Sequence, residues 1–436
     1  MQRNSERVLI VGVELARTSR STVSAGSAEE SLAELVTLAE SAGAIVVDRI
    51  LQHRSTLDAA TLIGSGKVQE LQARVVAEEI DSVIFDRELS PTQLRNLERR
   101  LDCKVIDRTQ LILDIFASRA RTREGQLQVE LAQLNYLLPR LTGRGTQMSR
   151  LGGGIGTRGP GETQLETDRR RIGSRIAKLK NEIERVRVTR GVQRSQREAV
   201  PLSTISLVGY TNAGKSTLFN RLTGASVLVD ARMFATLDPT VRQIRLPSGR
   251  RVLVSDTVGF IRNLPTTLVD AFRATLEEVT AAALLLHVVD ATSPDAEEHS
   301  SHVMKVLGEI GAETTPQILV LNKADRLENE GRDQDLPTLT HRLLGETARQ
   351  SQTEAVLVSA QTGIGLDDLL ARIDSRIALD PVSRHRFRLP LGEGRALNLL
   401  HERAAIVSKE YTDENCEIVA DTPESLRTLL EEFAVE

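Results

Sequence analysis

Eight consecutive residues near the middle of the chain have the types and spacing that hold a phosphate group. They match the phosphate-loop pattern G-x-x-x-x-G-K-[ST], and a threonine follows: Gly209, Tyr210, Thr211, Asn212, Ala213, Gly214, Lys215, Ser216 and Thr217. The glycines of this pattern let backbone N–H groups surround a phosphate at the start of a helix. The pattern predicts that Lys215 reaches the outer phosphates of a nucleotide and that the Ser216 hydroxyl is a ligand of Mg²⁺.

A second motif, D-x-x-G, follows the apolar run 251–255. It consists of Asp256, Thr257, Val258 and Gly259. A carboxylate at the end of a strand beside a phosphate loop can hold Mg²⁺ through water. We therefore expect Asp256 to hold the metal together with Ser216, and the Gly259 N–H to reach the terminal phosphate.

A third motif, N-K-x-D, predicts which base the nucleotide carries. It ends the apolar run 318–321 and consists of Asn322, Lys323, Ala324 and Asp325. The Asp325 carboxylate can accept hydrogen bonds from N1–H and the exocyclic amino group of guanine, whereas adenine offers neither donor. Asn322 either binds the base or braces the phosphate loop, and the stem of Lys323 can cover the face of the base.

A later stretch completes the predicted base site. It follows the apolar residues 356–358 and consists of Ser359, Ala360 and Gln361. Its backbone can offer an N–H to O6 of guanine. The three motifs and this stretch, each at the end of a strand, therefore predict a site specific for guanine nucleotides.

These motifs need elements that position them. The apolar, partly β-branched run 204–208 predicts a buried strand before the phosphate loop, and a helix is expected to open at residue 217. The last helix is expected over 365–378. We therefore predict a phosphate-loop domain with a mostly parallel sheet over residues 199–380.

Residues 1–118 alternate between the patterns of strands and helices. The strands are expected at 8–13, 44–47, 82–85 and 104–107, and the helices at 28–41, 68–79 and 91–101. Ser90 is a good N-cap for the last of these helices, with Pro91 at its first position. This alternation predicts a small α/β domain with a largely parallel sheet.

A tetrapeptide inside this region looks like half of a phosphate loop. It consists of Gly64, Ser65, Gly66 and Lys67, and the leading glycine of the pattern is missing. A tight turn into the following helix is the favoured interpretation, and phosphate binding at that helix is the alternative. Whether this domain binds a second nucleotide stays open.

Residues 119–198 are predicted to form a basic arm. They hold 18 Lys and Arg against 8 Asp and Glu, a local net charge of +10, while the whole chain has a net charge of −4. Helical spacing predicts a helix over 126–138, ended by Pro139, and a long helix over 163–190. Between them, residues 143–161 are too rich in glycine for regular structure. We expect two antiparallel helices with a basic loop at one end.

Two interpretations of this arm are open. It is either a helical linker between domains or an arm that inserts into phosphate-rich RNA. Arginines beside a glycine-rich loop favour the second interpretation.

Residues 381–436 suggest a compact α/β appendage without a chemical motif. A strand is expected at 384–389 and another at 417–420, with helices at 395–407 and 423–433. The basic stretch 384–388 either contacts RNA or forms a half-exposed strand.

Composition restricts the remaining possibilities. Aromatic residues make up 3% of the chain and tryptophan is absent, so stacking on single-stranded bases is not expected as the main binding mode. The two cysteines lack metal-ligand spacing and suit a reducing compartment. His287 lies in an apolar run, and His299 and His302 fit an exposed helix, so no metal site is expected there. With neither a signal peptide nor a membrane-spanning run, we expect a cytoplasmic monomer.

Together these motifs resemble the GTPase superfamily of translation factors and Ras-like proteins. More closely, the phosphate loop, the residues after Asp256, the glycine-rich segment 152–161 and one further stretch resemble the HflX family of ribosome-associated GTPases. That stretch begins with Phe234, Ala235, Thr236, Leu237 and Asp238. The resemblance covers roughly residues 1–380.

The resemblance implies an Mg²⁺-dependent enzyme that converts GTP to GDP. It implies that Lys215, Thr236 and Gly259 act on the terminal phosphate, and that Thr236 is a further ligand of Mg²⁺, with Thr240 as the competing switch threonine. It also implies binding to the large ribosomal subunit and its ribosomal RNA, and some family members split or rescue stalled ribosomes.

One position predicts a slow enzyme. Ras-like enzymes place a glutamine directly after D-x-x-G to orient the attacking water, and here that position is Phe260. Intrinsic hydrolysis should therefore be slow and a ribosomal partner should accelerate it. The alternatives are a GTP-regulated RNA-binding factor in ribosomal or transfer RNA processing, and a nucleotide-regulated protein scaffold.

Overall fold

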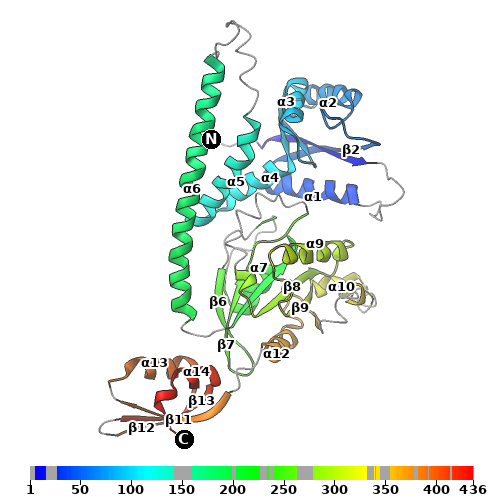
Figure 1. The fold of residues 1–436 in the computed structure, drawn as a ribbon. Coiled ribbons are helices and arrows are strands. Elements are labelled where there is room, and N and C mark those ends of the chain that lie inside the picture. The colour runs from blue at the N-terminus through cyan, green and yellow to red at the C-terminus, as the bar shows by residue number, and fades with distance from the viewer. Residues whose placement is uncertain are drawn as a thin grey trace.

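A computed structural model of the chain describes most of its residues. The described residues are 5–15, 27–141, 160–198, 203–225, 233–234, 240–262, 278–330, 338, 340–343, 354–377, 382–390, 392–412 and 415–435. Within them the chain forms three β-sheets, the first two beside one very long helix and the third beyond the end of that helix (Figure 1).

The first sheet is parallel and has the strand order β2-β1-β3-β4. Its strands are β1 (Arg7–Leu15), β2 (Ile45–Arg54), β3 (Ser82–Phe85) and β4 (Lys104–Asp107). Its connecting helices are α1 (Ser27–Ser41), α2 (Ser65–Ala77) and α3 (Pro91–Leu101). The predicted alternation of strands and helices is confirmed. Strand β1 is buried on both faces, as a strand covered by helices must be.

One local prediction in this part agrees with the structure and another needs correction. Ser90 caps α3 in a capping box with Gln93, each side chain accepting the backbone N–H of the other. Helix α2 begins at Ser65, three residues before the predicted start, so Ser65, Gly66 and Lys67 are helical and only the extended Gly64 precedes them. Lys67 forms an ion pair with Glu70 at 2.6 Å within the same helix, and phosphate binding at this helix stays a prediction.

A helix that the sequence analysis did not predict follows the first sheet. This helix, α4 (Arg108–Arg119), is capped by Asp107, whose carboxylate accepts the Gln110 N–H at 2.9 Å. Its apolar residues are buried between the first sheet and the second, together with those of α1. Helices α1 and α4 therefore form the layer that joins the two sheets.

The arm consists of two antiparallel helices, α5 (Arg123–Arg140) and α6 (Pro160–Glu198). Arg175 on α6 pairs with Glu130 on α5 through two bonds of 2.7 Å, and Arg123 meets Glu182 at 3.0 Å. These two contacts set the antiparallel register. Figure 1 shows α6 running past α5 toward β6 and β7.

The predicted end of the first arm helix and the predicted start of the second both need correction. Helix α5 continues through Pro139 to Arg140, because a proline in the last turn disturbs few remaining backbone bonds. Helix α6 has 39 residues and begins at Pro160, so Gly161 lies in the helix rather than in the glycine-rich segment. Proline suits a first helical position, where its missing N–H is not needed. Residues 143–159 lie outside the described residues.

The second sheet has the order β10-β9-β8-β5-β7-β6 and is parallel except for the hairpin β6–β7. Its strands are β5 (Thr204–Gly209), β6 (Thr240–Arg245), β7 (Arg251–Asp256), β8 (Leu284–Asp290), β9 (Gln317–Asn322) and β10 (Glu354–Leu357). The described helices beside it are α7 (Lys215–Thr223), α9 (Ala296–Glu309), α10 (Ala324–Glu330) and α12 (Leu366–Arg376). The α/β fold with a mostly parallel sheet behind the phosphate loop is confirmed.

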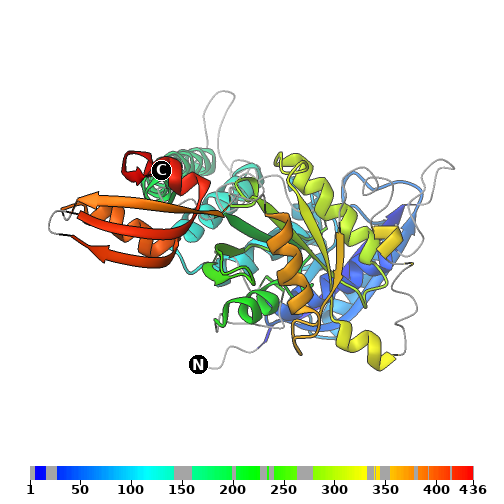
Figure 2. The same ribbon diagram turned by 90° about the horizontal axis from the view of Figure 1, so that it is seen from below.

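The third sheet is antiparallel, has the order β12-β13-β11-β14 and lies to one side of the other two (Figure 2). Its elements are β11 (Val382–Pro390), α13 (Gly394–Arg403), β12 (Ala405–Tyr411), β13 (Asn415–Pro423), α14 (Glu424–Leu429), a 3-10 turn (Glu431–Phe433) and β14 (Ala434–Val435). The helix predicted over 395–407 ends at Arg403, because the β-branched residues after it join the sheet as β12.

The basic stretch of this sheet forms the strand β11, and its arginines pair across the sheet. Arg384 pairs with Asp421 at 2.8 Å and Arg388 with Glu417 at 2.7 Å across β11 and β13. The strand is thus present with exposed arginines, and its contact with RNA stays a prediction. No described helix of the chain is both long and apolar enough to cross a membrane.

Candidate nucleotide site

The phosphate loop joins β5 to α7 and is shaped by two glycines. A Cβ at Gly209 would lie 2.2 Å from the carbonyl oxygen of Val288 on the neighbouring strand. Gly214 has a φ of +96°, and a Cβ there would lie 2.2 Å from Asn322 Nδ2. Only glycine fits both places, and the N-terminus of α7 then faces the loop.

Lys215 is held inside the loop by backbone oxygens. Its Nζ donates to the carbonyls of Gly209 at 3.0 Å and Tyr210 at 2.8 Å. An ammonium group has three donors, so one N–H is left for a phosphate. Burial lowers the pKa of Lys215 to about 8, and the Asp256 carboxylate opposes this shift. Incoming phosphates would further favour the charged form.

Ser216 and Asp256 lie together, as the motifs predict. The Ser216 hydroxyl donates to Asp256 Oδ2 at 2.7 Å, and the carboxylate is fully buried at the end of β7. A hydroxyl and a carboxylate are oxygen ligands of the kind that Mg²⁺ prefers, so these two residues fit the metal. Thr240 opens β6 directly opposite Asp256 in the ladder. Thr236 lies outside the described residues, as do Ala235, Leu237 and Asp238.

Residues 256–262, here called the switch segment, are bound to the phosphate loop. The Phe260 N–H donates to Gly209 at 3.1 Å, and the Thr211 N–H donates to the Phe260 carbonyl at 2.8 Å. A Cβ on Gly259 would lie 3.0 Å from Lys215 Nζ, so this glycine packs directly on the lysine. Phe260 is buried, and its side chain offers no group that could orient water.

Asn322 connects the base site to the phosphate loop. Its Nδ2 donates to the Ala213 carbonyl at 2.8 Å, and its Oδ1 accepts the Ala360 N–H at 3.0 Å. The bracing role that the sequence left open is therefore present, and the Ala360 N–H is donated to Asn322 in this structure. The Ser359 hydroxyl donates to Asp325 Oδ1 at 2.6 Å and fixes the carboxylate that is expected to read guanine.

Lys323 is held by a residue that the sequence analysis missed. Its Nζ meets Asp290 Oδ2 at 2.6 Å, and its backbone has a φ of +69°. Asp290 ends β8, and its other oxygen accepts the Thr292 hydroxyl at 2.6 Å. The sequence signal for Asp290 is its position as an acidic residue at the end of an apolar run.

Two side chains of the predicted site face the first sheet instead of the loop. Phe234 is buried with a φ of +58°, and its ring meets Phe116 of α4 edge-on, with centroids 4.5 Å apart. The Tyr210 ring stacks on His299 with centroids 3.8 Å apart. The expectation of an exposed helix is wrong at His299, because α1 and the phosphate loop partly cover this side chain, whereas the His302 side chain is 34% exposed.

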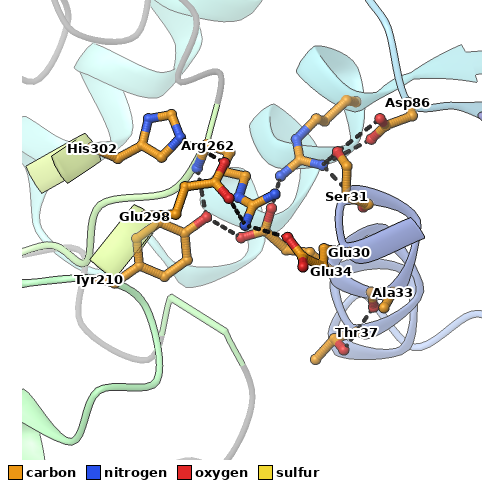
Figure 3. A network of polar contacts seen from close by, with 11 residues as sticks. Glu30, Ser31, Ala33, Glu34, Thr37, Asp86, Tyr210, Arg262, Glu298 and His302 are labelled. Atoms are coloured by element: carbon orange, nitrogen blue, oxygen red, sulfur yellow. Dashed lines mark hydrogen bonds and ion pairs between the residues drawn. The ribbon is translucent and has the colours of Figure 1, made fainter. Parts of the chain in front are cut away.

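A cavity of about 300 Å³ lies between α1, the phosphate loop and α9. Its lining includes Glu34, Tyr210, Asn212, His287, Asp295 and His299. Figure 3 shows Tyr210, Glu34, Glu30 and Arg262 converging beside it. Burial lowers the pKa of His287 to about 4, with Lys215 acting in the same direction, so its imidazole is neutral.

The structure thus brings the described residues of all three motifs to one edge of the second sheet. Family models match the chain in three consecutive parts, described as GTP-binding GTPase N-terminal (residues 29–117), GTP-binding GTPase Middle Region (119–197) and 50S ribosome-binding GTPase (204–323). Fold and site define a GTP-binding protein of the phosphate-loop class.

Curated relatives narrow this class. A GTPase HflX of Caldanaerobacter subterraneus subsp. tengcongensis is 44% identical over 439 residues, covering 100% of this chain and 95% of that protein. The GTPase HflX of Escherichia coli is 46% identical over 88% of both chains. The chain belongs to the HflX family of GTPases, so it binds GTP and hydrolyses it to GDP and phosphate.

A GTP-binding protein from the archaeon Sulfolobus solfataricus, crystallised with GDP, is 25% identical with a TM-score of 0.46, over 85% of this chain and 98% of that one.

Proposed function

We propose that this chain binds the large ribosomal subunit and its RNA through the arm, residues 119–198, and promotes the splitting or rescue of ribosomes. It would act as a cytoplasmic monomer, with its nucleotide domain at 199–380 between the α/β domain 1–118 and the appendage 381–436. The observation that carries the proposal is the match of residues 204–323 to a ribosome-binding GTPase model, next to an arm with exposed arginines.

The arm offers cationic groups that are open to a phosphate backbone. Arg170 and Arg171 have side chains that are 78% exposed, and their acidic neighbours on the same helix are also accessible to water. Such exposed pairs contribute little, so a phosphate can replace the carboxylate at small cost. The positive charge of the arm therefore remains available to RNA.

At the nucleotide, Lys215, Thr236 and Gly259 would contact the terminal phosphate, and Ser216, Thr236 and Asp256 would hold Mg²⁺. When bound, Mg²⁺ neutralises charge that develops on the outer phosphates. Without a water-orienting glutamine, intrinsic turnover is expected on the order of 10⁻⁴ to 10⁻³ s⁻¹. Large subunits should accelerate it by ordering the switch segment, and equal turnover with and without subunits would contradict this.

Co-sedimentation with purified large subunits, in GDP or a non-hydrolysable GTP analogue, tests the proposal. The variant R169Q/R170Q/R171Q should bind large subunits more weakly, with a salt slope smaller by up to roughly 2 to 3, since each lost phosphate contact contributes roughly 0.7 to 0.9. The matched control R384Q/R386Q/R388Q removes the same charge from β11 and should bind like the wild type. Absence of subunit binding in every nucleotide state would refute the proposal, and retained binding to a free precursor RNA would then favour the RNA-processing alternative.

A further inference from the structure

Tyr210 belongs to the phosphate loop, but its side chain points toward the first sheet. Its hydroxyl accepts the backbone N–H of Arg262 at 2.8 Å and donates to Glu34 of α1 (Figure 3). Burial raises the pKa of Tyr210, so the hydroxyl keeps its proton and remains a donor. One buried phenol therefore ties the end of the switch segment to helix α1.

The contact continues from α1 into α4. The second carboxylate oxygen of Glu34 accepts Nη2 of Arg108, the first residue of α4. The Arg108 side chain is 2% exposed, and it also binds Asp86 at 2.9 Å. A charge buried so deeply is costly to separate from its partners, so Glu34 and the start of α4 are held together.

The start of α4 is in turn bound to the arm. Asp107, which caps α4, is fully buried and accepts the Tyr136 hydroxyl at 2.8 Å and Arg140 Nη2 at 3.3 Å. Tyr136 and Arg140 lie in the last turns of α5, where the loop of the arm begins, and the Arg140 guanidinium also lies 3.5 Å from the centroid of the Tyr136 ring. Buried polar contacts, joined through the backbone between Asp107 and Arg108, thus run from the switch segment to Tyr136 and Arg140 at the end of α5, here called the foot of the arm.

A bound nucleotide can act on the switch segment, where this series of contacts begins. A terminal phosphate must reach Lys215, yet Gly259 packs on that lysine, and the switch segment is bound to the loop through Gly209 and Thr211. The terminal phosphate of GTP would therefore contact the switch segment, and GDP lacks this phosphate. This difference in contact is what a ligand needs in order to shift a conformational equilibrium.

We propose that Tyr210 is a positioning residue for GTP hydrolysis, and that Glu34, Arg108 and the start of α4 couple the switch segment to the foot of the arm at Tyr136. The coupling is reciprocal, so RNA bound to the arm also changes the position of the switch segment. This last consequence rests on the proposed function, whereas the coupling itself does not.

Because the chain has no tryptophan, a single one can report on the foot of the arm. Leu137 lies beside Tyr136 and is 42% exposed, so L137W provides the probe in the full-length protein. The emission of this protein is measured with GDP and with a non-hydrolysable GTP analogue. The measurement is repeated after adding Y210F, Y136F or both, and after adding Y411F, which removes the same hydroxyl from an exposed tyrosine of β12.

We expect the two nucleotides to give different emission in the L137W protein and in its Y411F control. Either Y210F or Y136F should remove most of this difference, because each takes one hydrogen bond out of the series. The double variant should lose no more than either single variant, since both break one series. An unchanged difference in Y210F, additive losses, or no difference in the L137W protein would each overturn the proposal.

Further measurements distinguish failure of the coupling from unfolding of a variant and from failure of the proposed function. Binding of fluorescent GDP and a thermal midpoint close to that of the wild type show that each variant is folded. If large subunits do not bind but the emission difference responds as expected, the proposed function fails and the coupling stands. If subunits bind but the tyrosine variants leave the difference unchanged, the coupling fails and the proposed function stands.

Discussion

The substitution N322D replaces the side-chain nitrogen of Asn322 with oxygen. This side chain connects the phosphate loop to the base site. Asn322 is 2% exposed, donates through Nδ2 to Ala213 and accepts through Oδ1 from Ala360. The introduced carboxyl keeps the acceptor but replaces the donor with an oxygen. The N322D protein therefore tests the bond to the phosphate loop while the packing is preserved.

The expected magnitude follows from the burial of both partners. The Ala213 carbonyl loses a hydrogen bond of 2.8 Å that is buried away from solvent. Leaving such a buried group unsatisfied costs about 1 to 3 kcal/mol. If the cost falls on the nucleotide-bound state, the dissociation constant for GDP rises about 5- to 150-fold.

The pH dependence of this loss has a defined sign. Burial raises the pKa of a carboxyl group, and its protonated form can again donate to Ala213. The affinity of N322D for GDP should therefore recover as the pH falls from 8 to 6. A wild-type protein measured in parallel gives the reference at each pH.

Equilibrium titration with fluorescent GDP is the assay. N96D is the matched control, because Asn96 makes the same kind of bond to the Ala60 carbonyl at 3.0 Å on an exposed part of α3. The reasoning is refuted if N322D binds GDP as tightly as the wild type at pH 8, or if N96D loses as much affinity.

Three further outcomes are expected. D325N should lower affinity for GDP at least about 100-fold, because two hydrogen bonds to a charged group are each worth about 1.5 to 3 kcal/mol. Xanthosine diphosphate has a C2 carbonyl that suits an amide, so D325N should gain affinity for it in a competition titration. An unchanged preference for GDP over xanthosine diphosphate would contradict the assignment of Asp325 to the base. G214A should abolish GDP binding in the same titration, since Gly214 combines a positive φ with a 2.2 Å approach to Asn322. His287 stays neutral in the folded chain down to about pH 4, whereas an unfolded histidine takes a proton near pH 6.5, so stability is lost as the pH falls between these values. H287L should remove about 2 kcal/mol of this loss at pH 5, seen as a smaller fall in the thermal midpoint, and parallel curves would show the shift to be absent.

The parts of the fold that sequence predicts best are those in which one local rule acts alone. Ser90 and Pro91 mark the start of α3 because both act through the backbone next to them. Helix α4 is hard to predict although Asp107 caps it, because its residues pack against two sheets and leave only a narrow polar face at Gln110, Asp114 and Ser118. Residues 405–407, the start of β12, are predicted as helix because their conformation is decided by pairing with β13 and not by local propensity.

The candidate site divides in the same way. The backbone requirements of phosphate binding select residue types at fixed spacing, so Gly214, Lys215 and Ser216 are readable in one sequence. Glu34 and Arg108 are not, since a buried ion pair between α1 and α4 depends on a tertiary contact between residues far apart in the chain. Tyr210 was recognised only as a loop residue, because nothing in the motif specifies the direction of its side chain.

The length of α6 has a mechanical consequence. A helix of 39 residues is roughly 58 Å long at 1.5 Å per residue. A tilt of about 10° about its middle, where Arg175 and Glu182 contact α5, moves each end by about 5 Å, nearly one helical turn. The helix is thus a lever, and a small rotation at these contacts changes which groups its ends can touch.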